Sequence, residues 1–588
     1  MADEDARTLL ILYATETGNA IHAADYIARQ CRRIAFQCRV ADIETFSLPD
    51  LLSETIVLFV VSTTGSGVEP RSMTPLWNNL LRSDLPLDVF EDLYFSVFGL
   101  GDTSYEKFCW AAKKLSRRLE SLGACEFYAR GEGDEQHAHG IDGALQPWTD
   151  ELLRILLEMF PLPGGLEIIP PDEIPPPRVL LNPVSTLNES QDPLKSDLQY
   201  HKGVVRTNER ITDPFWYQDV RLFEFDVEDD IQYEPGDVAI INPYASDDDV
   251  SAFLSTMHWE DAADEPLSIE QSMYDQSLPD HLPETTTLRI LFTRFLDFSA
   301  VPRRYFFQMI RHFTTDELEK EKLEDFLTPE GADDLYEYTV RVRRTIWEVL
   351  SDFRHVAIPR DYILDVFPAL RPREFSIASS IKKHPHQIHL CIAMVKYRTK
   401  LKIPRKGVCT SYLSTLKAGD VLRIGLRKGL LRLPHNADTP VICVGPGTGV
   451  APMRAVIEQR LADGAKSDVL YFGCRSAGKD QHFAVEWQKY AESGHLQYRV
   501  ACSRDGPEGV PRIYVQDLIR EDAAQIWDLI GVRKGWVLIS GSSNKMPQAV
   551  REALSFAVES AGKYPEAQAK KYIHAMETEG RLIEECWD

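Results

Sequence analysis

Three loops in the first 110 residues combine glycine with hydroxyl or amide side chains, which are groups that can hold an anion. The first loop, Thr15 to Ala20, follows the apolar run Leu9–Tyr13 and precedes a predicted helix. A helix N-terminus offers backbone N–H groups and the positive end of the helix dipole to a phosphate. The loop has no Lys or Arg and lacks the G-x-x-x-x-G-K-[ST] order of nucleotide-hydrolysing loops. It therefore predicts a phosphate monoester held by hydrogen bonds, with a well-capped helix start as the simpler alternative.

Two more loops of this kind follow later apolar runs. Residues 62–67 come after the run Ile56–Ser62, and residues 100–109 come after Tyr94–Phe98. In an open parallel sheet, ligands bind at the carboxyl ends of strands, near the point where the strand order reverses. Tyr105 adds an aromatic face for a planar ring. The first 160 residues resemble a flavodoxin, and this resemblance implies a doubly wound sheet with FMN as the ligand.

The flavodoxin resemblance also assigns residues to parts of FMN. Many relatives carry an aromatic residue where this chain has Thr64, so the ring is expected to be stacked on one face only. The implied contacts are Thr15, Glu16, Thr17, Gly18, Asn19 and Ala20 for the phosphate; Ser62, Thr63, Thr64 and Gly65 beside the isoalloxazine; Leu100, Gly101, Asp102, Thr103, Ser104, Tyr105, Glu106, Lys107, Phe108 and Cys109 over its other side; and Asp134 and Glu135 near its edge.

A second pair of motifs points to FAD. Arg373-Glu374-Phe375-Ser376 begins a strand-like run, and Gly407-Val408-Cys409-Thr410 follows about thirty residues later at a predicted helix start. Arginine can pair with a pyrophosphate through two hydrogen bonds, and the helix N-terminus can bind the remaining oxygens. In this order the motifs resemble the FAD-binding half of the ferredoxin–NADP reductase family. The resemblance assigns to FAD the residues Arg343, Arg373, Glu374, Phe375, Ser376, Gly407, Val408, Cys409 and Thr410, with the Ser376 hydroxyl near flavin N5.

A third motif indicates a nicotinamide dinucleotide. Residues 445–449, Gly-Pro-Gly-Thr-Gly, follow the apolar run Val441–Val444 and precede a predicted helix, a context that fits pyrophosphate binding by Thr448 and its neighbours. An NAD site would need an acidic residue for the ribose hydroxyls, whereas NADP needs cations for its 2′-phosphate. The segments after Gln497–Cys502 offer such cations and predict NADPH. The expected contacts are Ser503, Arg504, Arg512, Ile513, Tyr514, Val515 and Gln516.

Four residues are candidates for hydride transfer. Reductases of the ferredoxin–NADP family place a cysteine, a serine and an acidic residue around the nicotinamide and flavin N5, and a C-terminal aromatic over the flavin. By this likeness, Ser376, Cys474, Glu585 and Trp587 take those roles. For the tryptophan alone, hydrophobic docking of the tail is the simpler reading.

The elements that must position these residues fall into three blocks. Apolar strands alternate with helices in residues 1–160 and 433–588, which predicts parallel sheets covered by helices. Residues 161–195 are expected to be a linker, because eight prolines fall within 161–186 and prevent a helix. Residues 196–432 are expected to form an FAD-binding β-barrel with a polar, helical insert at about 246–370. The predicted fold is therefore α/β and multidomain.

Composition limits the classes of partner. The net charge is −25, with 14 basic and 25 acidic side chains in residues 1–160, so nucleic acid is a poor partner and a basic protein surface a good one. The ten cysteines are scattered, which predicts no metal site and no disulfide framework. No apolar run reaches the ~18 residues of a spanning helix, and the acidic N-terminus is unlike a targeting peptide. A cytoplasmic protein without a membrane anchor is expected.

The order of the three blocks resembles the diflavin reductase family, and within it the branch that serves cytosolic iron–sulfur protein assembly. The resemblance implies hydride transfer from NADPH to FAD, single-electron transfer to FMN, and reduction of an iron–sulfur acceptor of the anamorsin type. Docking is expected on acidic residues near the flavin edge, such as Glu69 and Asp102. Two alternatives remain open. One is a soluble reductase for a haem protein or a sulfite reductase partner, and the other is a non-catalytic docking protein that keeps the flavoprotein folds.

Overall fold

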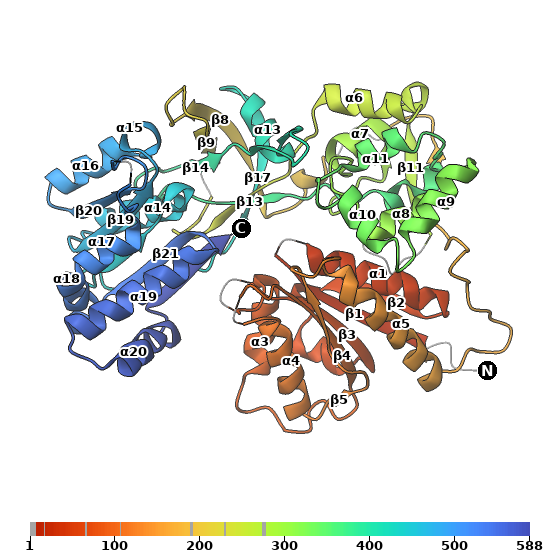
Figure 1. The fold of residues 1–588 in the computed structure, drawn as a ribbon, viewed down its shortest axis with the longest axis horizontal. Coiled ribbons are helices and arrows are strands. Elements are labelled where there is room, and N and C mark those ends of the chain that lie inside the picture. The colour runs from red at the N-terminus through yellow and green to blue at the C-terminus, as the bar shows by residue number, and fades with distance from the viewer. Residues whose placement is uncertain are drawn as a thin grey trace. The chain divides into compact units, whose positions relative to one another are not determined.

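The computed structural model describes residues 7–16, 18–64, 67–105, 107–187, 192–228, 231–272, 278–507 and 509–587. The chain divides into two compact units (Figure 1). The N-terminal unit combines Met1–Glu189 with Asp247–Leu370, and the C-terminal unit combines Ser190–Ser246 with Arg371–Asp588.

The N-terminal unit begins with a parallel sheet of strand order β2-β1-β3-β4-β5, in which β6 also pairs with β4. Successive side chains of a strand point to opposite faces, so both faces of β1 and β3 are apolar and buried. Helices α1 and α5 cover one face, and α3 and α4 cover the other (Figure 1). The elements are β1 Thr8–Ala14, α1 Asn19–Arg33, β2 Gln37–Asp42, α2 Leu48–Leu52, β3 Ile56–Ser62, α3 Thr74–Leu80, β4 Tyr94–Gly101, α4 Trp110–Ser121, β5 Cys125–Glu126, β6 Gly131–Asp134 and α5 Asp142–Met159.

The rest of the N-terminal unit is mainly helical. Phe253 forms the centre of its aromatic core and stacks on Phe298 with 4.6 Å between ring centroids. Residues 161–178 contain no helix or strand, but β7 then pairs antiparallel with β11, so the expected linker segment 161–195 includes a strand. The elements are β7 Val179–Pro183, α6 Asp247–Thr256, β11 Leu267–Gln271, β12 Thr285–Thr286, α7 Leu288–Arg294, α8 Arg304–Ile310, α9 Glu317–Phe326, α10 Ala332–Tyr338, α11 Ile346–Asp352 and α12 Ile363–Val366.

The C-terminal unit begins with a six-stranded antiparallel sheet of order β13-β10-β17-β8-β9-β14. A bridge between Ile377 and Leu390 joins its two ends, so the sheet forms a nearly closed barrel. The apolar interior includes Phe223 and Phe225 of β9. The elements are β8 Tyr200–Arg210, β9 Val220–Val227, β10 Val238–Ile241, β13 Arg373–Ser376, β14 Gln387–Ala393, β15 Lys396–Arg398, β16 Pro404–Lys406, α13 Val408–Thr415 and β17 Val421–Arg427.

A second parallel sheet, of order β20-β19-β18-β21-β22, completes the C-terminal unit. Helices α14 and α16 pack on one face, while α17 to α20 pack on the other. The elements are β18 Val441–Val444, α14 Val450–Ala462, β19 Asp468–Cys474, α15 Ala477–Asp480, α16 Ala484–Glu492, β20 Leu496–Cys502, α17 Val515–Glu521, α18 Ala523–Trp527, β21 Trp536–Ser542, α19 Lys545–Ser560, α20 Glu566–Thr578 and β22 Leu582–Trp587. The predicted fold class, with a doubly wound sheet, a barrel carrying a helical insert and a parallel sheet, is confirmed.

Candidate functional site

The first predicted anion loop lies between β1 and α1 in the N-terminal unit. Gly18 adopts a left-handed conformation with φ of +89°, and its N–H donates to Oγ1 of Thr15 at 2.8 Å. No side chain caps α1, and its first turn holds no acidic residue. The Glu16 carboxylate instead accepts a hydrogen bond from the backbone N–H of Arg71 at 2.7 Å. The helix start therefore keeps N–H donors for a phosphate, as expected for FMN, although Thr17 lies outside the described residues.

One cation reaches this loop from a distant part of the chain. Nη2 of Arg303, which directly precedes α8, donates to Oδ1 of Asn19 at 2.6 Å. The loop itself contains no Lys or Arg, so this cation comes from another part of the fold. Sequence spacing could not reveal the contact, because 284 residues separate the two side chains.

The other two loops lie at the same edge of the sheet. Thr63 follows β3 and donates its backbone N–H to the carbonyl of Leu100 at 2.9 Å. Its Oγ1 atom is buried without a hydrogen-bond partner in the described structure, so it remains available to a ligand. The backbone N–H and the hydroxyl of Thr64 both donate to the carbonyl of Val68. Gly65 and Glu106 lie outside the described residues.

A network joins the loop after β4 to β6. Asp134 accepts hydrogen bonds from the backbone N–H and hydroxyl of Thr103, at 3.0 and 2.7 Å. Partial burial alone would raise the pKa of Asp134, but the bonds from Thr103 and Gln136 lower it. Asp102 accepts from Ser104 and Gln136. These carboxylates therefore hold the loop in shape, with Tyr105, Lys107 and Phe108 in the same loop and Glu135 exposed beside it.

Some predicted contact residues are buried in the hydrophobic cores. Their side chains pack inside the protein, so only their backbone groups remain for a cofactor. They are Ala20, Leu100, Cys109, Cys409 and Val515. Burial raises the pKa of the Cys109 and Cys409 thiols to about 12, which keeps both protonated at neutral pH.

The expected FAD motifs meet in the barrel. Strand β13 carries Arg373 to Ser376 and pairs with β10, while Glu374 forms an ion pair with Arg427 at 2.6 Å. Gly407 precedes α13, whose first turn has no acidic residue and no side-chain cap. Thr410 Oγ1 donates to the Gly407 carbonyl at 3.2 Å and fixes this helix start. The exposed Arg373 and the helix N-terminus fit a pyrophosphate. Arg343 belongs to the N-terminal unit and has a positive φ of 51°.

The barrel and the parallel sheet of the C-terminal unit meet at two of the predicted hydride-transfer residues. Ser376 Oγ donates to Oε1 of Glu585 at 2.9 Å, and Glu585 is buried. Glu585 lies on β22 in register with Ser540 of β21. The hydroxyl of Ser540 is buried without a hydrogen-bond partner in the described part of the chain. Ser540 is therefore a candidate that the sequence analysis missed. Trp587 follows on β22, half-exposed.

Cys474 does not join this group. It ends β19, and β18 and β21 separate β19 from β22. At ~4.8 Å per strand, Cys474 and Glu585 lie about 14 Å apart across the sheet. The Cys474 Sγ atom instead lies 3.6 Å from Sγ of Cys502. The role of Cys474 in hydride transfer stays a prediction, and Ser540 is a further candidate because its unpartnered hydroxyl lies in register with Glu585.

The glycine turn after β18 lies against β21. A Cβ atom on Gly449 would lie 2.2 Å from the Ser540 carbonyl oxygen, so only glycine allows this approach. Gly447 has φ of +59° with open space around it, and Thr448 lies between the two in a 3₁₀ turn. Helix α14 begins directly afterwards. A turn of this shape before a helix N-terminus fits a pyrophosphate.

The predicted 2′-phosphate clamp is partly assembled. The backbone N–H of Ser503 donates to the Cys474 carbonyl at 3.0 Å, and that of Arg504 to the Arg475 carbonyl at 2.8 Å. Arg475, which the sequence analysis missed, therefore lies beside Arg504, and both guanidinium groups lie over the ring of Tyr217. Arg512, Ile513 and Tyr514 are exposed before α17, where Gln516 lies. Within the described ranges, no hydrogen bond joins Arg512 to Ser503 or Arg504.

Comparison with known proteins decides the family. Models for flavodoxin, an FAD binding domain and an oxidoreductase NAD-binding domain match residues 11–148, 197–412 and 443–552. Proteins named NADPH-dependent diflavin oxidoreductase 1 from Cryptococcus neoformans and Xenopus laevis are 40% and 39% identical to this chain. The alignments cover 98% and 99% of this chain and 100% and 99% of those proteins. The chain belongs to the NADPH-dependent diflavin oxidoreductase family.

A diflavin oxidoreductase uses FMN in its flavodoxin module, FAD in its barrel and NADPH in its nucleotide-binding module. A mouse relative of the same name is 37% identical over 98% of this chain. The unpartnered Thr63 and Ser540 hydroxyls and the uncapped starts of α1 and α13 fit these three groups. In the described ranges, no helix is long and apolar enough to cross a membrane.

Proposed function

We propose that this reductase passes single electrons to a small iron–sulfur protein of the anamorsin type in cytosolic iron–sulfur protein assembly. When bound, FAD accepts hydride from NADPH and FMN releases electrons one at a time, which is the chemistry that flavins supply. The chain binds and orients these groups and presents a docking surface for the acceptor. The likeness of its three blocks to the iron–sulfur branch of the family supports this acceptor class.

The residues divide among the roles as follows. Ser376 and Glu585, with Ser540 beside them, orient the nicotinamide at the flavin, and Trp587 covers the flavin face until the nicotinamide arrives. Arg504, Arg475 and Ser503 bind the 2′-phosphate, with Arg512 nearby in sequence. The remaining FMN and FAD contacts are those that the two family resemblances assign.

The proposal that the acceptor docks on the flavodoxin module rests on the acidity of that module. Residues 1–160 have 11 more acidic than basic side chains. The two acids first expected to dock a partner have other contacts, because Glu69 pairs with Lys114 at 2.9 Å and Asp102 bonds Ser104 and Gln136. Glu44 replaces them as the test position. It is exposed and lies in the 3₁₀ turn after β2, at the carboxyl edge of the sheet, where the predicted FMN loops also lie.

The experiment compares charge reversal at the two edges of one sheet. Glu44→Lys changes the carboxyl edge, and Glu91→Lys changes an equally exposed acid just before β4, at the amino edge. Attraction between opposite charges raises the encounter rate and is screened over about 8 Å at physiological salt. Glu44→Lys is expected to slow reduction of a purified iron–sulfur acceptor severalfold at low salt, with Glu91→Lys close to wild type. The rate at which a small neutral dye is reduced is expected to be the same in both variants as in the wild type.

The acceptor is identified by capture from cytosol on the intact chain, followed by NADPH-dependent reduction of the captured protein. A haem protein or a sulfite reductase subunit as the reduced partner would refute the iron–sulfur assignment and leave the diflavin reductase. Equal effects of Glu44→Lys and Glu91→Lys would refute docking at the carboxyl edge. A purified chain without flavin colour would favour a non-catalytic docking protein.

A further inference from the structure

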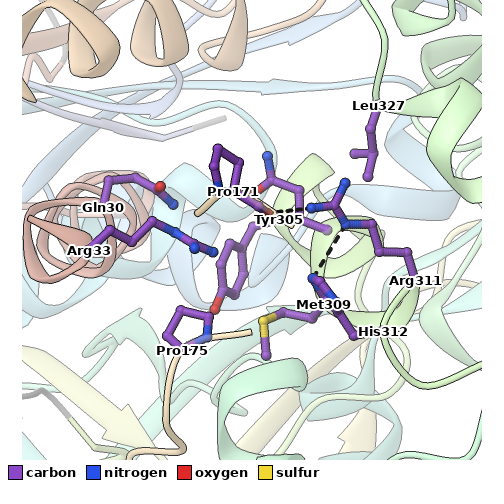
Figure 2. A pocket seen from close by; sticks show the side chains of 10 residues that line it. Gln30, Arg33, Pro171, Pro175, Tyr305, Met309, Arg311, His312 and Leu327 are labelled. Atoms are coloured by element: carbon purple, nitrogen blue, oxygen red, sulfur yellow. Dashed lines mark hydrogen bonds between the residues drawn. The ribbon is translucent and has the colours of Figure 1, made fainter. Parts of the chain in front are cut away.

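Four segments of the N-terminal unit line a cavity of about 230 Å³, to which Leu327 after α9 contributes one side chain (Figure 2). Helix α1 contributes Arg33, the proline-rich segment before β7 contributes Pro171 and Pro175, and α8 with the residues after it contributes Tyr305, Arg311 and His312. None of these residues belongs to the loops assigned to FMN, FAD or NADPH. The volume lies below the ~300–1,000 Å³ of sites for drug-sized ligands, so the cavity suits a small molecule.

Two guanidinium groups point into this cavity from opposite sides (Figure 2). Nη1 of Arg33 donates to the carbonyls of Pro170 and Glu173, at 2.7 and 2.9 Å. Nη2 of Arg311 donates to the carbonyl of Pro171 at 2.5 Å. A guanidinium has five N–H donors, so each arginine keeps donors beyond these bonds. Among the described residues, neither arginine has a carboxylate within ion-pair distance.

The surroundings of the two arginines are positive. Burial lowers the pKa of Arg33, and the charge of Arg311 lowers it further. Burial also lowers the pKa of His312 to about 4, with contributions from Arg311, Arg33 and Lys320 that the exposed Asp172 only partly opposes. His312 is therefore neutral at pH 7. Its Nε2 lies 3.4 Å from Nε of Arg311 and accepts that hydrogen bond, so its Nδ1–H is a third donor.

We propose that this cavity binds a phosphate dianion, either inorganic phosphate or the end group of a small phosphomonoester. The planar fork of arginine matches phosphate oxygens with two parallel hydrogen bonds. Neither arginine has a carboxylate within ion-pair distance among the described residues, and Asp172 acts on Arg33 only from further away. The dianion neutralises both charges at once. Because α1, the proline-rich segment and α8 each contribute to the cavity, the bound anion also holds these three segments together.

A purely structural role for the arginines explains only part of the arrangement. Bonds to the carbonyls of Pro170, Pro171 and Glu173 fix the proline-rich segment without any ligand. They do not explain why two like charges are partly buried next to one another, which costs free energy unless an anion compensates. The two readings differ in one measurable respect, because only the binding site makes stability depend on phosphate.

The test uses the full chain with both flavins bound and with saturating NADP⁺, so that the other phosphate sites are filled. Inorganic phosphate is titrated by calorimetry against chloride at equal ionic strength. We expect one phosphate per chain, and about ten- to a hundredfold weaker binding in Arg33→Gln and Arg311→Gln, because each loses a charge-assisted contact. Arg117→Gln, at an exposed arginine of α4 in the same unit, is the matched control and is expected to bind like wild type. Glycerol 3-phosphate distinguishes the sources: tighter binding than phosphate indicates a phosphomonoester, and equal or weaker binding indicates the free ion.

Three outcomes overturn the proposal. The first is that phosphate and chloride give equal effects in the titration. The second is that Arg117→Gln and Arg311→Gln lose phosphate affinity equally. The third is that the unfolding midpoint of the wild type does not rise with phosphate. If a glutamine variant fails to fold, Arg311→Lys keeps the charge and removes the fork. It is expected to fold and still bind phosphate several times more weakly, and wild-type affinity in Arg311→Lys would contradict the fork geometry.

Discussion

The hydroxyl of Ser376 donates a hydrogen bond to Oε1 of Glu585 at 2.9 Å and thereby joins the FAD barrel to the last strand of the nucleotide-binding sheet. The two residues are 209 positions apart in the sequence. Ser376 is the last residue of the motif that begins at Arg373, and Glu585 belongs to the C-terminal strand that also carries Trp587. A buried carboxylate that accepts from a serine hydroxyl can orient that hydroxyl and favour positive charge nearby. This position is therefore suited to the nicotinamide ring, which gains positive charge as hydride leaves.

Removing either partner is expected to slow hydride transfer. Glu585→Gln keeps a hydrogen-bond acceptor and loses the charge, whereas Ser376→Ala loses the hydroxyl. A hydrogen bond to a charged group contributes about 1.5–3 kcal/mol, so each variant should reduce flavin roughly ten- to a hundredfold more slowly. Anaerobic stopped-flow absorbance with NADPH measures the rate, and FAD content together with NADP⁺ affinity serve as controls. Wild-type rates in both variants would show that the pair only joins the two parts of the unit.

Ser540 and Cys474 are expected to respond differently. Ser540 lies in register with Glu585, while Cys474 lies two intervening strands away. Ser540→Ala removes a buried hydroxyl that has no partner within the described ranges, so the free energy of unfolding should change little, while hydride transfer slows severalfold. Cys474→Ala should leave hydride transfer within about twofold of wild type, since its thiol faces Cys502. The opposite ranking in stopped-flow experiments would favour the predicted role of Cys474 over that of Ser540.

These residues show what the sequence could and could not provide. Strands β3 and β18 begin and end where their apolar runs do, because strands of a parallel sheet covered on both faces need continuous apolar side chains. Strand β7 was missed, because its proline-rich surroundings suggest a spacer. The glycine and arginine motifs were found because their spacing is local. Ser540, Arg475 and Arg303 were missed because their roles depend on strand order and on contacts between distant segments.

Arg475 and Arg504 are expected to contribute together to NADPH preference. Their guanidinium groups lie 5.3 and 5.9 Å from the ring centroid of Tyr217, and Arg475 also donates to Gln218 at 2.5 Å. Losing a charged contact to the 2′-phosphate costs about 1.5–3 kcal/mol. Arg504→Ala and Arg475→Ala should therefore each weaken the binding of NADPH about ten- to a hundredfold. NADH lacks this phosphate and should be affected much less. Titration of the oxidised enzyme with NADP⁺ and NAD⁺ measures both losses, and equal losses would place the 2′-phosphate elsewhere.

His482 makes the C-terminal unit sensitive to acid. Burial lowers its pKa to about 4, whereas an unfolded histidine titrates near 6.5. Between these values the unfolded chain binds a proton that the folded chain does not, so stability falls as pH falls from 6.5 towards 4. The loss from pH 7 to pH 4.5 is about 2 to 3 kcal/mol for this group. His482→Gln should reduce the pH dependence of urea unfolding by that amount, while exposed His574→Gln should not. Identical slopes in the two variants would rule out this source of acid sensitivity.

Arg303 is expected to strengthen FMN binding from outside the flavodoxin module. Its guanidinium holds Oδ1 of Asn19 at 2.6 Å, directly at the start of α1, and it also acts on the buried carboxyl of Asp142. The phosphate loop has no cation of its own, and Arg303 is a positive charge that the fold brings to it without a carboxylate of that loop as its partner. Arg303→Ala should raise the dissociation constant of FMN roughly tenfold, because one charge-assisted contact near a phosphate is lost.

The measurement for Arg303 is the recovery of flavin fluorescence when holoenzyme is diluted, so it does not depend on turnover. Arg341→Ala is the matched control, since Arg341 is an exposed arginine of the same insert that pairs with Glu337. Arg303→Lys keeps the charge and should recover part of the affinity. FAD retention should stay at the wild-type level in all three variants. If Arg303→Ala and Arg341→Ala lose FMN equally, the insert contributes no specific cation, and hydrogen bonds of the loop alone hold the phosphate.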